Sequence, residues 1–215
     1  MSDIPALIRT ISILAVPVIF AIILHEVMHG VVARMLGDDT AARAGRLTLN
    51  PIPHIDLFGT IILPALLAFL HLPIFGYAKP VPVDFRRLHN PRRGMILVAA
   101  AGPLTNFFLA IVSAFALKMV APHLLGPLGH QVWLPIALML KASVAINIIL
   151  AVFNLFPLLP LDGGRVLTGL LPLRAARSFA KLEPYGFLIL LLLLYTDSVE
   201  AVINPIINAI ARVLL

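Results

Sequence analysis

The stretch ISILAVPVIFAIILHEVMHGVVARM, residues 11–35, carries an H-E-x-x-H motif inside an apolar run. On a helix, residues four apart share a face, so His25 and His29 can offer two imidazoles to one zinc ion. Glu26 then lies beside them as the general base of a metalloprotease site. Ionisable groups are costly where lipid is expected, and they indicate function by default. The stretch therefore predicts metal-assisted peptide hydrolysis inside a membrane.

The composition of the chain indicates that lipid is its main solvent. Only 12% of its 215 residues are charged and 60% are hydrophobic, whereas a soluble domain has about 25% charged residues. This length fits a single membrane domain, residues 1–215. With no cysteine in the chain, a metal must bind His, Asp or Glu. The net charge of +6 does not indicate a nucleic-acid partner, because the basic residues flank apolar runs.

Apolar runs predict an all-α polytopic membrane protein with five to six transmembrane segments. A spanning helix needs about 20 mostly apolar residues. Five runs meet or approach this length: residues 4–35, 94–120, 132–156, 185–195 with their flanks, and 199–214. A sixth run, residues 57–72, has Pro64 in its middle, and it either spans the membrane or enters and returns as a broken hairpin.

The positions of Lys and Arg favour the re-entrant hairpin. Residues 121–131 and 196–200 contain neither, whereas three other loops are rich in them, as cytoplasmic loops are. If all three basic loops are cytoplasmic, the run 57–72 must begin and end on the same side. The N-terminus is then outside and the C-terminus inside. The basic residues are Arg34, Arg43 and Arg46 in the first loop, Lys79, Arg86, Arg87, Arg92 and Arg93 in the second, and Arg165, Arg174, Arg177 and Lys181 in the third.

Two proline-punctuated stretches, residues 46–51 and 77–83, predict short β-like segments near the active site. Pro80 and Pro82 suit an edge strand, and the spare backbone groups of such an edge can hold an unwound peptide by strand addition. We expect the catalytic core at residues 4–165 and a C-terminal helical hairpin at residues 183–215.

Two histidines do not complete a catalytic zinc site, which usually has three protein ligands and an open position for water. Among the carboxylates in apolar surroundings, Asp162 is the strongest candidate, since it closes the run NLFPLLPLDGG at residues 154–164. The prolines break the helix, and the glycines let the chain turn sharply near a metal. The alternative is that Asp162 is only a turn residue before Gly163 and Gly164.

These motifs resemble those of the site-2 proteases, a family of zinc intramembrane metalloproteases. The resemblance rests on the H-E-x-x-H motif at 25–29, on the 154–163 stretch with Asn154, Pro157 and Asp162, and on GPLTN at 102–106 and the stretch 45–60. It covers nearly the whole chain. The chain is similar to the small group that has only the membrane core, without the inserted PDZ domain or the appended CBS pair of longer members.

The resemblance implies that His25, His29 and Asp162 bind one Zn²⁺ per chain and that Glu26 is the base for a zinc-activated water. It also implies that Asn154 helps to hold the substrate backbone. The expected partners are transmembrane protein or peptide substrates and the lipid bilayer. The expected location is the cell membrane, with the active site near the cytoplasmic face, and the oligomeric state is left open.

Four other polar residues have two interpretations each. Asn106 either contributes a polar contact to the site and its substrate or serves helix packing, and for Asn147 packing is favoured. His54 and Asp56 either orient a zinc-binding histidine as second-shell residues or are turn residues at the membrane surface.

Two other functions are compatible with a cluster of His and Asp in a membrane. The main alternative is a transporter or metal channel that uses the cluster as a transit site, but such a site does not need Glu26 as a base. The other is a catalytically silent membrane chaperone built on a protease core, and the intact motif argues against it.

Overall fold

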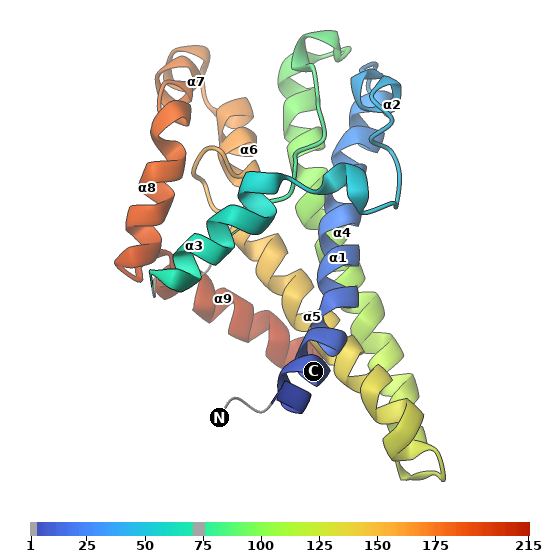
Figure 1. Ribbon diagram of the computed structural model, residues 1–215. Helices are drawn as coiled ribbons and strands as arrows, with labels where there is room; N and C mark the ends of the chain where they lie inside the picture. Colours follow the sequence, from blue (N-terminus) through green and yellow to red (C-terminus); the bar gives the residue numbers. More distant parts are fainter. Residues whose placement is uncertain (1–3, 71–75) are drawn as a thin grey trace.

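The computed structural model describes residues 4–70 and 76–215 as a helical molecule (Figure 1). Its described part contains no β-strand. The α-helices are α1 (Ile4–Met35), α2 (Thr40–Arg43), α3 (Leu63–Phe69), α4 (Pro91–Val120), α5 (Leu134–Asn154), α6 (Asp162–Leu170), α7 (Leu173–Ala180), α8 (Glu183–Tyr195) and α9 (Ser198–Leu214). Short 3-10 turns cover Ile52–His54, Phe85–Arg87 and Ala121–Leu125, and π-helical turns cover Leu57–Ile62 and Gly129–Trp133. The prediction of a helical chain is confirmed.

Three helical stretches in the described residues are long and apolar enough to cross a membrane: Ile8–Met35, Pro91–Leu125 and Gly129–Asn154. A fourth arises if α7 and α8, which are bent by 67° at their junction, are counted as one broken span. The prediction of five to six spans is therefore not confirmed. The physical reason is length, because α8 has 13 residues and rises only about 20 Å, against a hydrocarbon core of about 30 Å.

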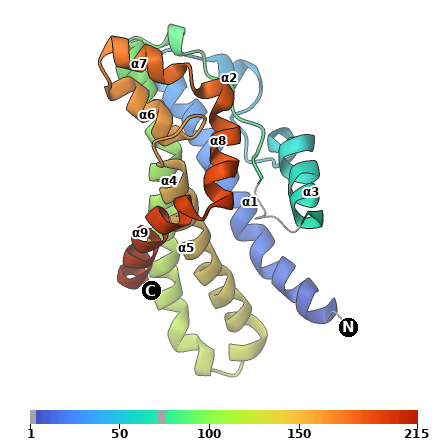
Figure 2. The same ribbon diagram turned by 90° about the vertical axis from the view of Figure 1, so that its left-hand side faces the viewer.

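The helices α1, α4 and α5 pack against one another and cross near the middle of the molecule (Figures 1 and 2). Their contact faces carry small residues, among them the buried Ala21, Ala99, Gly102 and Ala110. Helix association in lipid depends on close packing, and small side chains let the backbones approach. This close approach brings the H-E-x-x-H face of α1 against α4.

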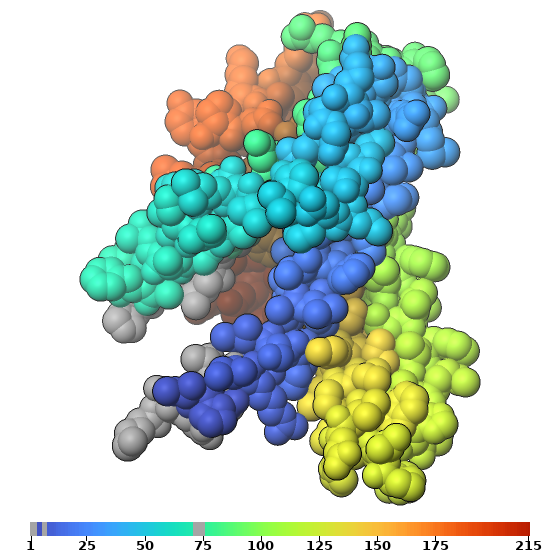
Figure 3. Space-filling view, turned by 45° about the vertical axis from the view of Figure 1, so that its right-hand side comes forward, coloured from blue at the N-terminus to red at the C-terminus, as the bar shows by residue number. Residues whose placement is uncertain are grey.

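The segment Leu57–Phe69 projects from this bundle as one continuous helical piece (Figure 3). Its 13 residues rise about 20 Å, which is too short for a full span. Near its start, the Gly59 carbonyl accepts a hydrogen bond from Tyr77 N at 3.0 Å, so the chain comes back to the point where this segment began. This return agrees with a re-entrant hairpin. Part of the expected run, residues 71–72, lies outside the described residues.

Residues 76–84 are extended but do not form a strand. Lys79 N donates to the His54 carbonyl at 2.9 Å, and Val81 N donates to Glu26 Oε2 at 2.8 Å. Pro80 and Pro82 have no N–H to offer, so a ladder cannot form along their edge. The expected β-like segments are therefore not confirmed. Residues 77–83 bond the His54 carbonyl and the Glu26 side chain instead of a partner strand, and residues 47–49 and 51 are bends.

Candidate metal centre

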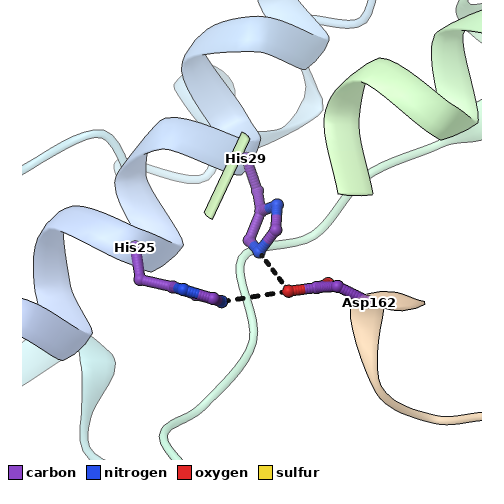
Figure 4. Close-up of side chains that lie close together, drawn as sticks. All are labelled: His25, His29 and Asp162. Atoms are coloured by element: carbon purple, nitrogen blue, oxygen red, sulfur yellow. Dashed lines mark ion pairs between the residues drawn. The ribbon is translucent and has the colours of Figure 1, made fainter. Parts of the chain in front are cut away.

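Two helices that are far apart in the sequence bring three candidate ligands together. His25 and His29 project from one face of α1, and Asp162 is the first residue of α6 (Figure 4). Asp162 Oδ2 lies 3.1 Å from His25 Nε2 and 3.3 Å from His29 Nε2. One ligand atom from each of the three residues lies within 4.8 Å of the others. The structure thus places the three predicted zinc ligands in a single cluster.

The two glycines after Asp162 let the chain fold back over the start of α6. A Cβ at Gly163 would lie 2.1 Å from the Leu155 carbonyl oxygen, and one at Gly164 would lie 2.4 Å from Leu159 N. Neither contact is possible for a residue with a side chain, so only glycine lets residues 155–159 pack this closely on the helix. The sequence interpretation located these glycines correctly but expected a sharp turn, whereas both lie inside α6.

The other end of α6 is held by Arg92 at the start of α4. Arg92 Nε donates to the Gly169 carbonyl at 2.6 Å, and its Nη2 donates to the carbonyls of Leu170, at 3.1 Å, and Leu171. The carbonyls at the end of a helix have no hydrogen-bond partner within the helix, and a guanidinium can donate to several of them at once. Arg92 therefore helps to fix the helix on which Asp162 is mounted. The sequence indicated Arg92 as a topology signal and gave no sign of this contact with α6.

The hydrogen bonds behind the two rings decide which nitrogen faces Asp162. His29 Nδ1 lies 2.7 Å from the Val98 carbonyl, which can only accept, so Nδ1 carries the proton. His25 Nδ1 lies 2.6 Å from Asn106 Oδ1, which also only accepts. In neutral imidazoles protonated at Nδ1, both Nε2 atoms present lone pairs. This is the tautomer that a metal at Nε2 requires.

The cluster fits a zinc ion. Two lone pairs and a carboxylate oxygen converge, and Asp162 Oδ2 is buried without a hydrogen-bond partner. Tetrahedral ligands at zinc distances of about 2.0–2.2 Å are about 3.3–3.6 Å apart. The two distances from Asp162 Oδ2 to the histidines, 3.1 and 3.3 Å, are close to this spacing, and all three ligand atoms lie within 4.8 Å of one another. A Cβ at Gly102 would lie 2.5 Å from His29 Nε2 and 2.6 Å from His25 Nε2, so α4 keeps room there by having no side chain.

Glu26 does not belong to this cluster, although it lies next to His25 in the sequence. Its Oε2 accepts the hydrogen bond from Val81 N at 2.8 Å, and the side chain is partly buried. No hydrogen bond reaches Oε1 from the described residues. This arrangement holds one carboxylate oxygen and leaves the other free, as a general base requires. The Val81 contact is made by a backbone group, and no sequence signal indicated it.

The remaining predicted residues are not members of the cluster, and of these only Asn106 is hydrogen-bonded to one of its histidines. Asn106 contacts His25 and not an open surface, since it is fully buried. Asn154 donates to the Leu150 carbonyl of its own helix at 2.9 Å. Asp56 Oδ1 accepts from Gly59 N at 2.7 Å, and His54 Nε2 lies 3.0 Å from the Thr48 carbonyl. The expectation that His54 and Asp56 orient a zinc-binding histidine finds no support, because Asn106 and the Val98 carbonyl bond the Nδ1 atoms of His25 and His29.

Comparisons with known proteins agree with these observations. Residues 129–195 match the family described as Peptidase family M50. The chain is 37% identical over 205 residues to "Putative zinc metalloprotease YwhC" of Bacillus subtilis, which covers 91% of this chain and 86% of that protein. It is 28% identical over 187 residues to Rip2 of Mycolicibacterium smegmatis, which bears the corresponding name, covering 85% and 66%. No solved structure matches the chain significantly.

A helix with H-E-x-x-H that faces an aspartate, within helices apolar enough to cross a membrane, defines a membrane-embedded metalloprotease. The similarity to YwhC extends over most of both proteins, and the family match covers α5 to α8. The chain therefore belongs to peptidase family M50, the site-2 protease family. It is a zinc metalloprotease and a multi-pass membrane protein, and the family implies membrane-protein substrates in the bilayer.

Proposed function

We propose that the protein is an intramembrane endopeptidase that hydrolyses peptide bonds in or near the transmembrane segments of its substrates. The observation that carries this proposal is the convergence of Asp162 with His25 and His29, which lie on a helix apolar enough to span a membrane. A soluble protease has no need for such a setting. The catalytic core at 4–165 and the helices at 183–215 are proposed to act as one domain.

In this proposal the three clustered residues hold the zinc ion through His25 Nε2, His29 Nε2 and the Asp162 carboxylate. Zinc, when bound, lowers the pKa of a water ligand to about 7 and polarises the scissile carbonyl. Oε1 of Glu26 is the oxygen available to accept a proton from an attacking water, because Val81 N–H holds Oε2. Glu26 then passes the proton to the leaving amine.

The substrate must present an unwound backbone, because a helix hides its carbonyls in internal hydrogen bonds. Residues 77–83 reach Glu26 through the Val81 N–H, and we propose that backbone carbonyls of this segment accept hydrogen bonds from a peptide. Asn154 uses its amide nitrogen on its own helix, which leaves Oδ1 to accept from a substrate N–H. These two features are proposed as substrate-binding elements.

The basic loops suggest on which side the reaction takes place. Arg34 follows His29 by five residues, about 7.5 Å of helix rise, and Arg165 follows Asp162 by three residues. The ligand residues of α1 and of α6 thus both lie close to basic segments, which the positive-inside tendency assigns to the cytoplasm. We propose a site just below the cytoplasmic headgroups of the cell membrane and cleavage in the cytoplasmic half of a substrate's span.

Purified protein incubated with a panel of single-span membrane peptides tests this proposal. Cleavage should occur, should stop with a zinc chelator, and should return when zinc is added. Mass spectrometry of the products should place the cuts in the cytoplasmic half, and helix-breaking residues near the cut should increase cleavage. Cuts in the outer half would overturn the topology. Uptake of zinc across vesicles without any peptide hydrolysis would favour the transit-site alternative.

A further inference from the structure

A chain of buried hydrogen bonds runs from His25 on α1 through α4 into α5. His25 Nδ1 lies 2.6 Å from Asn106 Oδ1, and Asn106 Nδ2 donates to Asn147 Oδ1 at 2.8 Å. Asn147 Nδ2 in turn donates to the Ser143 carbonyl at 2.9 Å and to the Ser143 hydroxyl at 3.2 Å. The side chains of Asn106 and Asn147 are buried, with 0% and 1% of their surface exposed. This series of hydrogen bonds is therefore shielded from water.

Backbone carbonyls decide how both amides in this chain are turned. Asn106 Nδ2 also donates to the Ala21 carbonyl at 3.2 Å, and a carbonyl can only accept. The opposite atom, Oδ1, must then face His25. For Asn147 the Ser143 carbonyl plays the same part, so its Oδ1 must face Asn106. Each amide is thus oriented by a backbone carbonyl, which cannot act as a donor. This fixes which atom donates and which accepts in every hydrogen bond from Asn147 to His25.

We infer that Asn147 is a positioning residue for the zinc site, acting through Asn106 on the ring of His25. Asn147 Oδ1 accepts from Asn106 Nδ2 at 2.8 Å, a shorter bond than the one to the Ala21 carbonyl at 3.2 Å. The two acceptors together keep the Asn106 oxygen turned toward His25, which keeps His25 protonated at Nδ1 and its Nε2 available to the metal. The other histidine has no such side chain behind it, since His29 is held by the Val98 carbonyl. The inference rests on the proposed zinc ligation by His25.

Simple helix packing does not explain why an amide occupies position 147. The residues around it in α5, Val144 and Ile148, are fully buried apolar side chains of the main core, together with Ala110 of α4. A buried amide without partners costs free energy, whereas an apolar residue packs there without that cost. Hydrogen bonds between helices in membranes contribute only modestly to helix association. A role in orienting His25 gives a reason for Asn147 that core packing does not.

The zinc affinity of purified variants tests the inference without using proteolysis. Asn106→Leu should lower the affinity about 10–100-fold and Asn147→Leu about 10-fold, as loss of groups behind a metal-binding histidine does. Ser113→Ala is the matched control, because Ser113 bonds the Ser143 hydroxyl at 2.8 Å and neither amide. It should leave the affinity unchanged. The visible spectrum of the cobalt-substituted protein should change in Asn147→Leu and not in the control, while the melting temperature of the metal-free proteins stays the same.

A double-mutant cycle then decides whether Asn147 acts through Asn106. In the Asn106→Leu background, Asn147→Leu should cause no further loss of affinity. An additional loss equal to that in the wild-type background would overturn the inference, as would a single variant with unchanged affinity and spectrum. Asn147→Ala serves the same purpose if the leucine variant does not fold. Retention of one zinc by His25→Ala would instead refute the ligand assignment in the proposed function.

Discussion

Glu26 is separated from the two histidines by the direction of its side chain rather than by distance along the chain. The histidines point toward Asp162, whereas Glu26 is held by Val81 N–H outside the cluster. At the scale of single residues, the difference between ligand and base therefore follows from what each side chain touches. Substitutions that keep those contacts and change only the chemistry should separate the two roles.

Glu26→Gln should stop proteolysis and leave zinc bound. Glutamine keeps an oxygen that can accept from Val81 N–H, so the fold is preserved, but it cannot take a proton from water. Loss of a general base lowers the rate by about 10²–10⁴-fold. Peptide cleavage and zinc content measured on the same sample provide the check, with Glu200→Gln on α9 as the control for removal of a carboxylate. Near-normal turnover by Glu26→Gln would refute the assigned role.

Asp162→Ala should lower the zinc content far more than Asp56→Ala does. Asp162 Oδ2 is a buried oxygen beside both Nε2 atoms, whereas Asp56 only accepts from Gly59 N. Elemental analysis of the two purified variants decides between them. Equal zinc content would mean that Asp162 is the turn residue of the alternative interpretation.

At the scale of elements, the position of the site depends on a short helix held at both ends. The nine residues of α6 begin under the loop 155–161, which only the two glycines permit, and end at the guanidinium of Arg92. A helix of this length is marginal by itself. The tertiary contacts at its ends therefore decide where Asp162 lies relative to α1.

Arg92→Met should loosen α6 and weaken zinc binding. The substitution removes the side-chain hydrogen bonds to the carbonyls of Gly169, Leu170 and Leu171. The expected loss of stability is about 1 kcal/mol, because these charge-assisted bonds are partly exposed to solvent. Arg93→Met is the matched control, since it removes the same charge one residue away, where no side-chain hydrogen bond is formed to the described residues. Thermal unfolding should separate the two variants, and equal melting temperatures would contradict the role of Arg92.

Asp38 fastens the end of α1 to the chain before α4. It is fully buried, with Oδ2 accepting from Asp84 N at 2.7 Å and Oδ1 from Thr40 N and Thr40 Oγ1. Burial by itself would raise the pKa of this carboxyl. The hydrogen bonds from Thr40 and Asp84 and the charge of Arg87 outweigh burial and hold the pKa below its usual value. The ionised form is thus favoured in the folded protein.

The sign of this shift predicts how stability depends on pH. A lowered folded-state pKa stabilises the fold above the unfolded value of about 3.9, and the contribution is lost as the pH falls through the folded pKa. Asp38→Asn should therefore melt at a lower temperature than the wild type at neutral pH. The difference should shrink as the pH falls below about 4. Melting curves of both proteins from neutral to acidic pH provide the check, and a constant difference would contradict the prediction.

At the scale of the whole molecule, the three long helices and the basic loops suggest one orientation in the membrane. The turn between α4 and α5 lacks Lys and Arg, and its Leu125 is 97% exposed. The opposite end carries Arg174, an exposed residue of α7 in the third basic segment. These two ends should lie on opposite sides of the bilayer.

Single cysteines test this orientation directly, because the chain has none of its own. A membrane-impermeant thiol reagent applied to intact cells should label Leu125→Cys and not Arg174→Cys. Both should react after the cells are opened, which controls for buried thiols. Labelling of Arg174→Cys alone in intact cells would reverse the topology and place the proposed site on the outer face.

The sequence by itself determined the helical class, the candidate zinc-binding face of α1 and the candidate third ligand, because these depend on local hydropathy, on a four-residue spacing and on a short Pro- and Gly-rich motif. The boundaries of α1, residues 4–35, agree with the apolar run. It could not determine the features that depend on how the helices pack. The expected five to six spans were not confirmed, because hydropathy does not show where a bend shortens a helix, as at the 67° junction of α7 and α8.

Only the tertiary structure decided which groups stand behind the ligands. Asn106 lies 81 residues from His25, and the carbonyl of Val98 has no side-chain signal at all. The absence of a ladder at residues 76–84 likewise depends on which groups that segment meets, and it meets Glu26 and a loop. Such contacts arise because small residues let α1, α4 and α5 pack closely. A local pattern states which side chains can bind zinc, whereas the orientation of each ring follows from the helices packed against it.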